Sequence, residues 1–271
     1  MGARLVVVGG GRMGEALIGG LLAGGWDLAE LCVVEKEPGR RLALVAQRPG
    51  LQVETMPPPA QGVVLAVKPA DVVATAQAVA GAGCTRVLSI AAGVALAALE
   101  DALGAGPARL PVVRAMPNTP ALVGAGAAAI AAGTWATEAD LAWAEEVLGS
   151  VGTVVRVPEA HLDAVTGLSG SGPAYVFLVA EALIDAGVLV GLPHEVSRNL
   201  AVQTLLGSAR LLDESGETPA ALRSAVTSPG GTTAAGLRAL EARGLRSALV
   251  EAVVAATERS RELGGSGQTG R

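Results

Sequence analysis

The pattern of hydrophobic and polar positions divides this chain into two parts. Up to about residue 158, short runs rich in β-branched residues alternate with segments of helical periodicity, which is typical of a parallel sheet with helices on both faces. The clearest strands are expected at residues 5–8, 31–34, 63–67, 87–91 and 112–115, with shorter ones near 125–130 and 153–157 and a helix at 138–148 between these two. The sheet is expected to end there.

After Pro158 the strand pattern stops and only helical patterns follow. Helices are expected at residues 174–190, 195–213, 219–226, 232–243 and 245–263. The remaining residues, 264–271, are Gly-rich and polar, as expected of a flexible tail. The fold class is therefore α/β, with an N-terminal domain at 1–158, an all-helical domain at 159–263 and a tail at 264–271.

The C-terminal helices carry alanine, leucine and valine on more than one face. A helix that buries one stripe is polar on its outer side, so a monomer would expose much of this apolar surface to water. The pattern predicts that the protein forms an intimate homo-oligomer.

Composition narrows the possible classes of function. The 271 residues are 51% hydrophobic and 17% charged, with a formal net charge of −5, which argues against a nucleic-acid binder that relies on a basic surface. Charges or glycines interrupt each apolar stretch before the roughly 18 to 20 residues that a membrane span needs, and the chain starts on a strand pattern rather than a secretory signal. We expect a soluble cytoplasmic protein that acts on a small molecule, without nucleic-acid or membrane partners.

Few side chains are suited to metal binding or acid–base chemistry. Cys32 and Cys84 lie far apart in apolar surroundings, which predicts buried reduced thiols and no metal site. The histidines are His161 and His194, and no lysine follows Lys68. A mechanism that needs histidine or lysine therefore has few candidates.

A glycine-rich segment directly follows the first expected strand. Gly9, Gly11 and Gly14 form a GxGxxG pattern just before a helix; they permit a tight turn, a close approach of the backbone to a pyrophosphate, and close packing of helix on strand. The helix start, at Arg12 and Met13, presents free N–H groups to the phosphates. A glycine triad alone is often only a turn, but this context predicts a Rossmann-type dinucleotide-binding domain.

An acidic residue stands where such a domain binds the ribose of its dinucleotide. Glu35 follows Gly14 by about 20 residues, at the end of the second expected strand, where a carboxylate accepts a hydrogen bond from the 2′-hydroxyl of NAD and repels a 2′-phosphate. Lys36, Arg40 and Arg41 lie just beyond and would accept the extra phosphate of NADP if the loop folds back. The sequence favours NADH and leaves NADPH open.

Further candidate segments lie at strand ends, on the edge at which open α/β sheets bind ligands. In Ala66-Val67-Lys68-Pro69, the proline fixes the turn and restrains the lysine, which predicts a positioned cation beside the dinucleotide; the alternative is an exposed lysine at a strand end. The small residues Ala91, Ala92 and Gly93 of an SIAAG segment would let a flat ring lie against the backbone. The segment RAMPNTP, at residues 114–120, is either part of this site or a structural turn.

Two glycine-rich segments open helices in the C-terminal part. The first, GLSGSGPAY at residues 167–175, is suited to close helix packing. The second holds Ser228, Gly230, Gly231, Thr232 and Thr233. A serine followed by proline is an ordinary helix start, but paired glycines before two threonines expose backbone N–H groups and hydroxyls at a positive helix end, which suits a carboxylate.

The chain resembles pyrroline-5-carboxylate reductase, the last enzyme of proline biosynthesis. The resemblance extends to about Leu263 and rests on segments in a fixed order: GxGxMGxA, AVKP, SIAAG, RAMPNTP, GLSGSGPAY and SPGGTT. It implies hydride transfer from NAD(P)H to the C=N carbon of Δ1-pyrroline-5-carboxylate, giving L-proline. It also implies a Rossmann domain followed by a helical dimerisation domain, and therefore a homodimer; a higher assembly of dimers stays open.

The resemblance implies roles for individual residues as well. The substrate would lie where one subunit's nucleotide domain meets its partner's helical domain, with the backbone of residues 230–233 holding the carboxylate and the hydroxyl of Thr233 meeting the imine nitrogen. Lys68 and Pro69 would line the cofactor, and residues 91–93 would pack near the nicotinamide. The chain departs from the family at Pro57-Pro58-Pro59, in place of a more polar helical stretch, and at Glu35, where many relatives have a small hydroxylated residue.

Three other functions are compatible with parts of the sequence. A 3-hydroxyacid dehydrogenase of similar build would use a lysine from the helical domain, and no lysine follows Lys68. A related imine or keto-acid reductase with a different small substrate is not excluded by the glycine-rich segments. A nucleotide-sensing protein without turnover would have no need of the intact SPGGTT segment.

Overall fold

The computed structural model describes residues 3–104 and 109–266. By its contacts the chain divides into two compact units, of which one comprises Met1–Ser171 with Val254–Arg271 and the other Gly172–Val253. The first unit holds a single eight-stranded sheet in the order β3-β2-β1-β4-β5-β6-β7-β8.

The strands and helices of the sheet unit follow the alternation expected from the sequence. The strands are β1 (Ala3–Val8), β2 (Leu31–Val34), β3 (Gln52–Glu54), β4 (Ala60–Leu65), β5 (Val87–Ser89), β6 (Val112–Met116), β7 (Gly126–Ala132) and β8 (Gly152–Arg156). The helices are α1 (Arg12–Ala23), α2 (Pro38–Gln47), α3 (Pro69–Ala80), α4 (Leu96–Leu103), α5 (Glu138–Gly149) and α6 (Leu162–Val165).

The order of the strands places a ligand-binding crevice beside β1. β1 pairs with β2 on one side and β4 on the other, and both pairings are parallel. The chain crosses the sheet in opposite directions from this point, and the carboxyl ends of the strands on either side of such a switch point leave a crevice. The loops after β1 and β4 are the two glycine- and proline-rich segments singled out in the sequence.

Two features of the sheet differ from the expectation. β7 runs antiparallel to β6, and β8 is parallel to β7, so the sheet is mixed rather than all-parallel. The reason is the short link at residues 117–125, which holds only a 3-10 helix at Thr119–Val123, whereas a parallel crossover needs a dozen or more residues. The edge strand β3 was not expected, because three residues with exposed polar ends carry no clear alternation.

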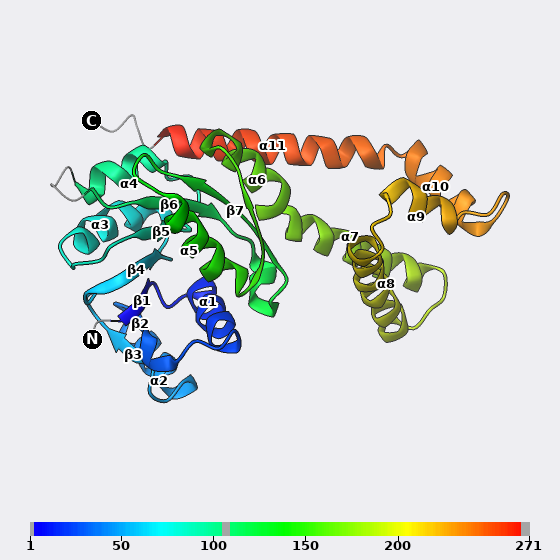
Figure 1. Cartoon of the computed structure of the whole chain (residues 1–271). Helices are drawn as coiled ribbons and strands as arrows, with labels where there is room; N and C mark the ends of the chain where they lie inside the picture. The colour runs from blue at the N-terminus through cyan, green and yellow to red at the C-terminus, as the bar shows by residue number, and fades with distance from the viewer. Residues whose placement is uncertain (1–2, 105–108, 267–271) are drawn as a thin grey trace. The chain divides into compact units, whose positions relative to one another are not determined.

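Two hydrophobic cores cover the two faces of the sheet. Side chains alternate between them along β1: Val6 and Val8 pack with α3, α4 and α6, whereas Leu5 and Val7 pack with α1, α2 and α5. Figure 1 shows α3 and α4 on the side of the sheet opposite to α1 and α5. Because β1 is covered on both faces, it reads as a continuous hydrophobic run, as buried parallel strands do.

The two cysteines are buried as free thiols, as expected, in the core that α3, α4 and α6 cover. Burial, aided by the nearby charge of Glu54, raises the pKa of the Cys32 thiol to about 11, and burial also raises the pKa of Cys84. At pH 8 a thiol with such a pKa is ionised in only about one molecule in a thousand, and the thiolate is the reactive form.

We expect both thiols to react with 5,5′-dithiobis(2-nitrobenzoate) at pH 8 at least about 100-fold more slowly in the folded protein than in 6 M guanidinium chloride, since burial limits both ionisation and access. The absorbance of the released thionitrobenzoate measures the rate. A fast phase in the folded protein that accounts for one thiol would contradict this burial.

The second unit is wholly helical and lacks a core of its own. Its helices are α7 (Gly172–Leu189), α8 (His194–Glu214), α9 (Pro219–Ala225), α10 (Thr232–Ala242) and the first part of α11 (Leu245–Ser266). Among residues 172–253, all of which the structure describes, Ala201 is the only buried apolar side chain. By contrast, Phe177 and Leu178 on α7 are 62% and 65% exposed. Such a surface indicates a missing partner.

One helical run is long enough and apolar enough to span a membrane, so the expectation that no segment meets these two criteria is wrong. The helical run Glu159–Leu189 meets both criteria, and none of its apolar window is buried in the single chain. The residues of α7 that the window draws on include the charged side chains Glu181 and Asp185. Core helices of soluble proteins meet the same two criteria.

Helix α11 continues to Ser266, three residues beyond the expected helix end. Gly264 to Ser266 therefore belong to a helix and not to a tail, and the rest of the predicted tail, residues 267–271, lies outside the described residues. Within the sheet unit, the hydroxyl of Ser260 on α11 donates to the carboxylate of Asp163 on α6 at 2.7 Å. This bond fastens the last turns of α11 to the sheet unit.

Candidate active site

The loop between β1 and α1 is shaped by three glycines with different steric surroundings. Gly9 has a φ of 109°, and a Cβ there would lie 2.6 Å from the carbonyl oxygen of Ala66. A Cβ on Gly14 would lie 2.2 Å from the carbonyl oxygen of Gly9. At Gly11, by contrast, an added Cβ would meet nothing within 4 Å. Gly11 is the glycine that faces open space, as the approach of a diphosphate to the backbone requires.

The start of α1 offers unpaired backbone donors beside this open space. Gly11 is the N-cap of α1, and within the described residues no side chain caps this helix. The first-turn N–H groups, which include those of Arg12 and Met13, have no partner inside a helix, and they lie at the positive end of the helix dipole. These residues fit the diphosphate of a dinucleotide.

Acidic and basic side chains from β2 and α2 hold the same loop in place. The carboxylate of Glu35 accepts hydrogen bonds from the N–H groups of Gly10 at 3.0 Å and Glu37 at 2.9 Å. The Nε of Arg40 donates to the carbonyl oxygen of Gly10 at 2.6 Å, and its guanidinium pairs with Glu15 at 2.7 Å. Both backbone groups of Gly10 are thereby fixed, so the loop is organised before any ligand arrives.

The segment after β4 lies at the same edge of the sheet. Ala66 extends the pairing, since its N–H donates to the carbonyl oxygen of Val8 at 2.8 Å. Val67 packs against the core. Lys68 is the N-cap of α3 and is exposed, and Pro69 is the first residue of the helix. The backbone conformation of Lys68 is thus set by the proline that follows it.

The SIAAG segment follows β5, the neighbour of β4. Ser89 ends the strand, Ala91 is buried and Ala92 is exposed. Gly93 has a φ of 73°, which a residue with a side chain adopts only at a cost. β4 and β5 are parallel, so this segment and the one after β4 come to the same edge of the sheet.

The RAMPNTP segment braces the site rather than facing it. Arg114 is buried, and its guanidinium pairs with Glu159 at 2.8 Å. The amide of Asn118 donates to the carbonyl oxygen of Ser169 at 3.0 Å and accepts from the N–H of Ala127 at 2.9 Å. The segment therefore ties β7 and the residues before α7 to the end of β6.

Residues Thr166–Gly170 form a short π-helix, a form of helix that is rare and frequently lies at functional sites. A Cβ on Gly170 would lie 2.5 Å from Cε of Met116, so the absence of a side chain lets this turn pack on β6. The N–H of Ser171 donates to the carbonyl oxygen of Thr166 at 2.8 Å. The first part of GLSGSGPAY is therefore a packed turn of the sheet unit.

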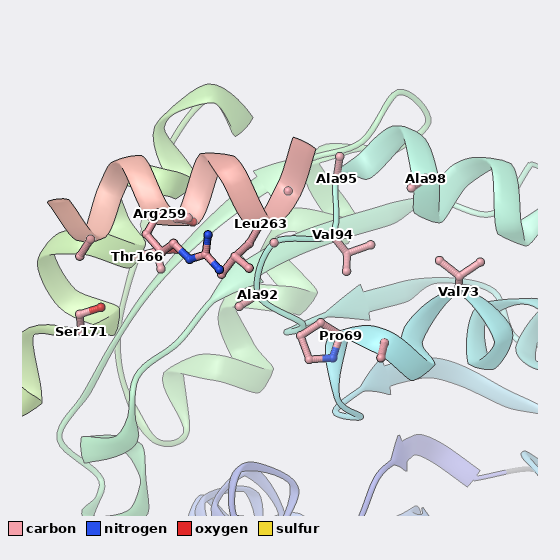
Figure 2. A pocket seen from close by; sticks show the side chains of 15 residues that line it. Pro69, Val73, Ala92, Val94, Ala95, Ala98, Thr166, Ser171, Arg259 and Leu263 are labelled. Carbon is pink, nitrogen blue, oxygen red and sulfur yellow. The ribbon is translucent and has the colours of Figure 1, made fainter. Parts of the chain in front are cut away.

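A cavity of about 600 Å³ lies at the carboxyl edge of the sheet, and residues of the sheet unit alone line it. Figure 2 shows the loop that carries Ala92, with Pro69 below it and Arg259 and Leu263 of α11 above it. The lining is mostly apolar, as is usual in small-molecule sites. The lining residues are Pro69, Ala70, Val73, Ala92, Gly93, Val94, Ala95, Ala98, Thr166, Ser171, Ala256, Arg259, Ser260, Leu263 and Gly264.

The SPGGTT segment belongs to the helical unit. Ser228 to Gly231 form a turn, in which the N–H of Gly231 donates to the carbonyl oxygen of Ser228 at 3.1 Å and Gly230 has a φ of 70°. α10 starts at Thr232 with Gly231 as its N-cap, so Ser228 is not the N-cap. Among the described residues no side chain caps α10. Thr233 is half-buried on its first turn.

The structure thus groups the sequence-predicted site residues into two sets. The loops after β1, β2, β4 and β5 lie in the sheet unit, and Pro69, Ala92 and Gly93 line its cavity. Ser228 to Thr233 lie in the helical unit. Sequence reasoning missed the α11 residues that line the cavity, such as Arg259. Nothing in the local sequence signals them, because the fold alone brings α11 to β5.

Two family models match this chain. A model described as pyrroline-5-carboxylate reductase dimerisation matches residues 159–263, and one described as NADP oxidoreductase, coenzyme F420-dependent, matches residues 4–93. A pyrroline-5-carboxylate reductase of Mycobacterium tuberculosis is 45% identical in an alignment of length 289, gaps included. The alignment covers 96% of this chain and 97% of the relative. The chain belongs to the pyrroline-5-carboxylate reductase family.

Solved structures agree with this membership. A pyrroline-5-carboxylate reductase from Coxiella burnetii has a TM-score of 0.89 at 35% identity and covers 97% of this chain and 99% of its own. A Plasmodium falciparum pyrroline carboxylate reductase with NADP bound has a TM-score of 0.82 at 30% identity, covering 97% and 98%. The predicted family and fold class are confirmed: this reductase has a Rossmann-type domain that uses NAD(P)H and a helical dimerisation domain.

Proposed function

We propose that this chain reduces Δ1-pyrroline-5-carboxylate to L-proline with NAD(P)H, as the last step of proline biosynthesis. The observation that carries the proposal is the coexistence of two uncapped helix starts in a member of this reductase family: α1 beside the open space at Gly11, and α10 at Thr232. One suits a diphosphate and the other a small carboxylate. A reductase for a small carboxylate-bearing imine needs both.

The residues of the sheet unit hold the cofactor. Gly9, Gly11, Arg12, Met13 and Gly14 bind the diphosphate, and Glu35 binds the adenosine ribose. The segments Ala66 to Pro69 and Ala91 to Gly93 line the nicotinamide half of the site. When bound, NAD(P)H supplies the hydride that reduces the C=N carbon.

The residues of the helical unit hold the substrate. At the positive end of α10, the carboxylate is bound by the backbone N–H groups of Gly230, Thr232 and Thr233 and by the hydroxyl of Ser228. The N–H of Gly231 closes the turn on the carbonyl oxygen of Ser228. The hydroxyl of Thr233 hydrogen-bonds to the imine nitrogen, so it orients the acceptor carbon and exchanges a proton with water. In the proposed homodimer, one subunit's sheet unit and its partner's α10 form each site.

Positioning accounts for most of the expected rate enhancement. A protonated imine is already a good hydride acceptor, and fixing two reactants in a reactive geometry contributes roughly 7 to 11 kcal/mol. A dedicated general acid contributes about 3 to 5 kcal/mol. The small number of histidines and lysines is therefore compatible with this mechanism.

The direct test is the fall in absorbance at 340 nm when Δ1-pyrroline-5-carboxylate is added to the protein and NADH or NADPH, with L-proline identified as the product. A bulkier cyclic imine and a 2-keto acid serve as comparison substrates. Faster turnover of either, at equal concentration, would indicate the related imine or keto-acid reductase instead.

We expect Thr233→Ala to lower kcat by about 10- to 100-fold, because it removes one hydrogen bond to the reacting nitrogen. The Kd of the cofactor should stay within about twofold, since Thr233 lies in the other unit. Thr233→Ser keeps the hydroxyl and should restore most of the activity. Equal kcat in the alanine variant and the unmodified enzyme would contradict the proposed role.

The remaining proposals concern the whole protein. The functional division is a dinucleotide-binding domain at residues 1–158 and a substrate and dimerisation domain at 159–263. We propose that the protein is a soluble cytoplasmic homodimer. The exposed apolar faces of α7 and α8 support the dimer, and the dimerisation model matched at 159–263 covers both helices. Burial against a second copy also accounts for the apolar run at Glu159–Leu189 without a membrane.

A further inference from the structure

We propose that Glu35 and Glu37 together select NADH over NADPH, with Glu37 occupying the backbone donors that a 2′-phosphate would need. This inference rests on the proposed function, because it concerns the ribose end of the same cofactor site. Glu35 is the acidic residue that the fingerprint predicts, whereas Glu37 has no place in that fingerprint. The Plasmodium relative with NADP bound shows that the family fold accepts NADP, so selectivity in this chain has to come from its own loop.

Glu37 caps α2 with its side chain. Its carboxylate accepts hydrogen bonds from the N–H groups of Gly39 at 3.1 Å and Arg40 at 2.5 Å. These donors stand at the positive end of α2, directly after β2. A phosphate attached to the 2′-position of the ribose would need hydrogen-bond donors from this loop. In this chain a built-in carboxylate already fills that place.

Glu35 remains able to bind a hydroxyl but not a phosphate. Each of its carboxylate oxygens accepts one bond from the backbone, at Gly10 and at Glu37, and each has a second lone pair. A ribose 2′-hydroxyl can donate to such an oxygen. A 2′-phosphate carries a charge of about −1.5 to −2 and no such donor, so it would meet Glu35 and Glu37 as like charges.

The arginines that would offset this repulsion are engaged elsewhere. Arg40 bonds to the carbonyl oxygen of Gly10 and pairs with Glu15. Arg41 donates to the carbonyl oxygens of Glu35 at 3.1 Å and Lys36 at 2.7 Å. To turn its whole guanidinium fork toward a phosphate, either arginine would have to leave backbone acceptors that shape the loop. Of the three cations that would favour NADP, this leaves the exposed Lys36, which lies between Glu35 and Glu37 in the sequence.

Selectivity is measured by the Kd of NADH and of NADPH for the purified protein without substrate, and by kcat/KM for both cofactors with substrate. We expect the unmodified protein to favour NADH by at least about tenfold in both ratios. The difference should appear in Kd and KM and not in kcat, because the ribose is remote from the reacting carbon.

Glu37→Ser removes the charge but keeps a residue type that caps helices well, and Glu37→Gly removes both the charge and the side-chain acceptor, with glycine tolerated at helix N-caps. We expect both variants to bind NADPH about tenfold more tightly and NADH within about twofold of the unmodified protein. Asp101→Ser, which removes an exposed carboxylate at the end of α4, is the matched control and should leave both Kd values unchanged. Thermal denaturation checks that each variant is folded.

Two results would overturn the inference: tighter binding of NADPH by the unmodified protein, or an unchanged ratio of Kd values in both Glu37 variants. The binding ratios decide the selectivity even if pyrroline-5-carboxylate is not reduced. Absence of turnover with either cofactor would count against the proposed reaction alone.

Discussion

Valine at position 11 is expected to abolish binding of the dinucleotide while the protein remains folded. Gly11 has φ and ψ of −73° and −175°, which valine adopts readily, and an added Cβ would meet nothing within 4 Å. The same space has to receive the diphosphate, whose bonds to backbone N–H groups are charge-assisted and worth about 1.5 to 3 kcal/mol each. Loss of even one such bond corresponds to about a 10- to 150-fold change in Kd.

We therefore expect Gly11→Val to weaken NADH binding by at least about 100-fold, measured by titration of nucleotide fluorescence. The matched variant is Gly14→Val, whose Cβ would lie 2.2 Å from the carbonyl oxygen of Gly9. It should lose stability as well as binding, because α1 can no longer pack on the loop. NADH binding by the folded Gly11→Val variant at the original affinity would place the diphosphate elsewhere.

Glutamate at position 178 is expected to break the dimer and to remove activity with it. Leu178 is 65% exposed on α7 of the single chain, and burial of a leucine against a partner contributes about 1.5 to 3 kcal/mol. A two-fold interface contains each substitution twice, and an unpaired buried charge adds a further penalty. We expect the Kd of the dimer to rise at least about 1,000-fold.

Light scattering over a range of protein concentrations measures this change. Activity per subunit should fall in parallel with the dimer fraction, because each proposed site combines two subunits. Val123→Glu is the control: Val123 is 80% exposed in the 3-10 helix after β6, within the sheet unit. A monomeric Leu178→Glu variant with full activity would show that one chain completes the site.

The parts of the fold that the sequence predicted are those with strong local patterns. β1, β2, β5 and β6 are largely apolar strands that are almost wholly buried, and the glycine loop follows the first of them. Strand direction leaves no trace in periodicity, so the antiparallel β7 could only be inferred from the short link at residues 117–125. The three-residue strand β3 is too short and too polar to show a pattern.

The candidate site divides in the same way. Gly9, Gly11 and Gly14 can be predicted from the sequence, because the backbone geometry of the dinucleotide loop requires glycine at fixed spacings. Glu37 and Arg259 cannot be predicted in this way, since a capping glutamate and an exposed helical arginine are common in helices of every kind. Their relation to the site depends on contacts between α2 and the glycine loop, and between α11 and the loop after β5, which only the folded chain provides.

One wall of the cavity is made by α11 residues between Ala256 and Gly264, although the sheet is complete at Arg156. At a synthesis rate of about 5 to 20 residues per second, the ribosome needs on the order of ten seconds to add the intervening segment. The nascent sheet has therefore emerged, and has time to fold, well before the helix that encloses its cavity is made. An inactive nucleotide fold thus precedes the enzyme during translation.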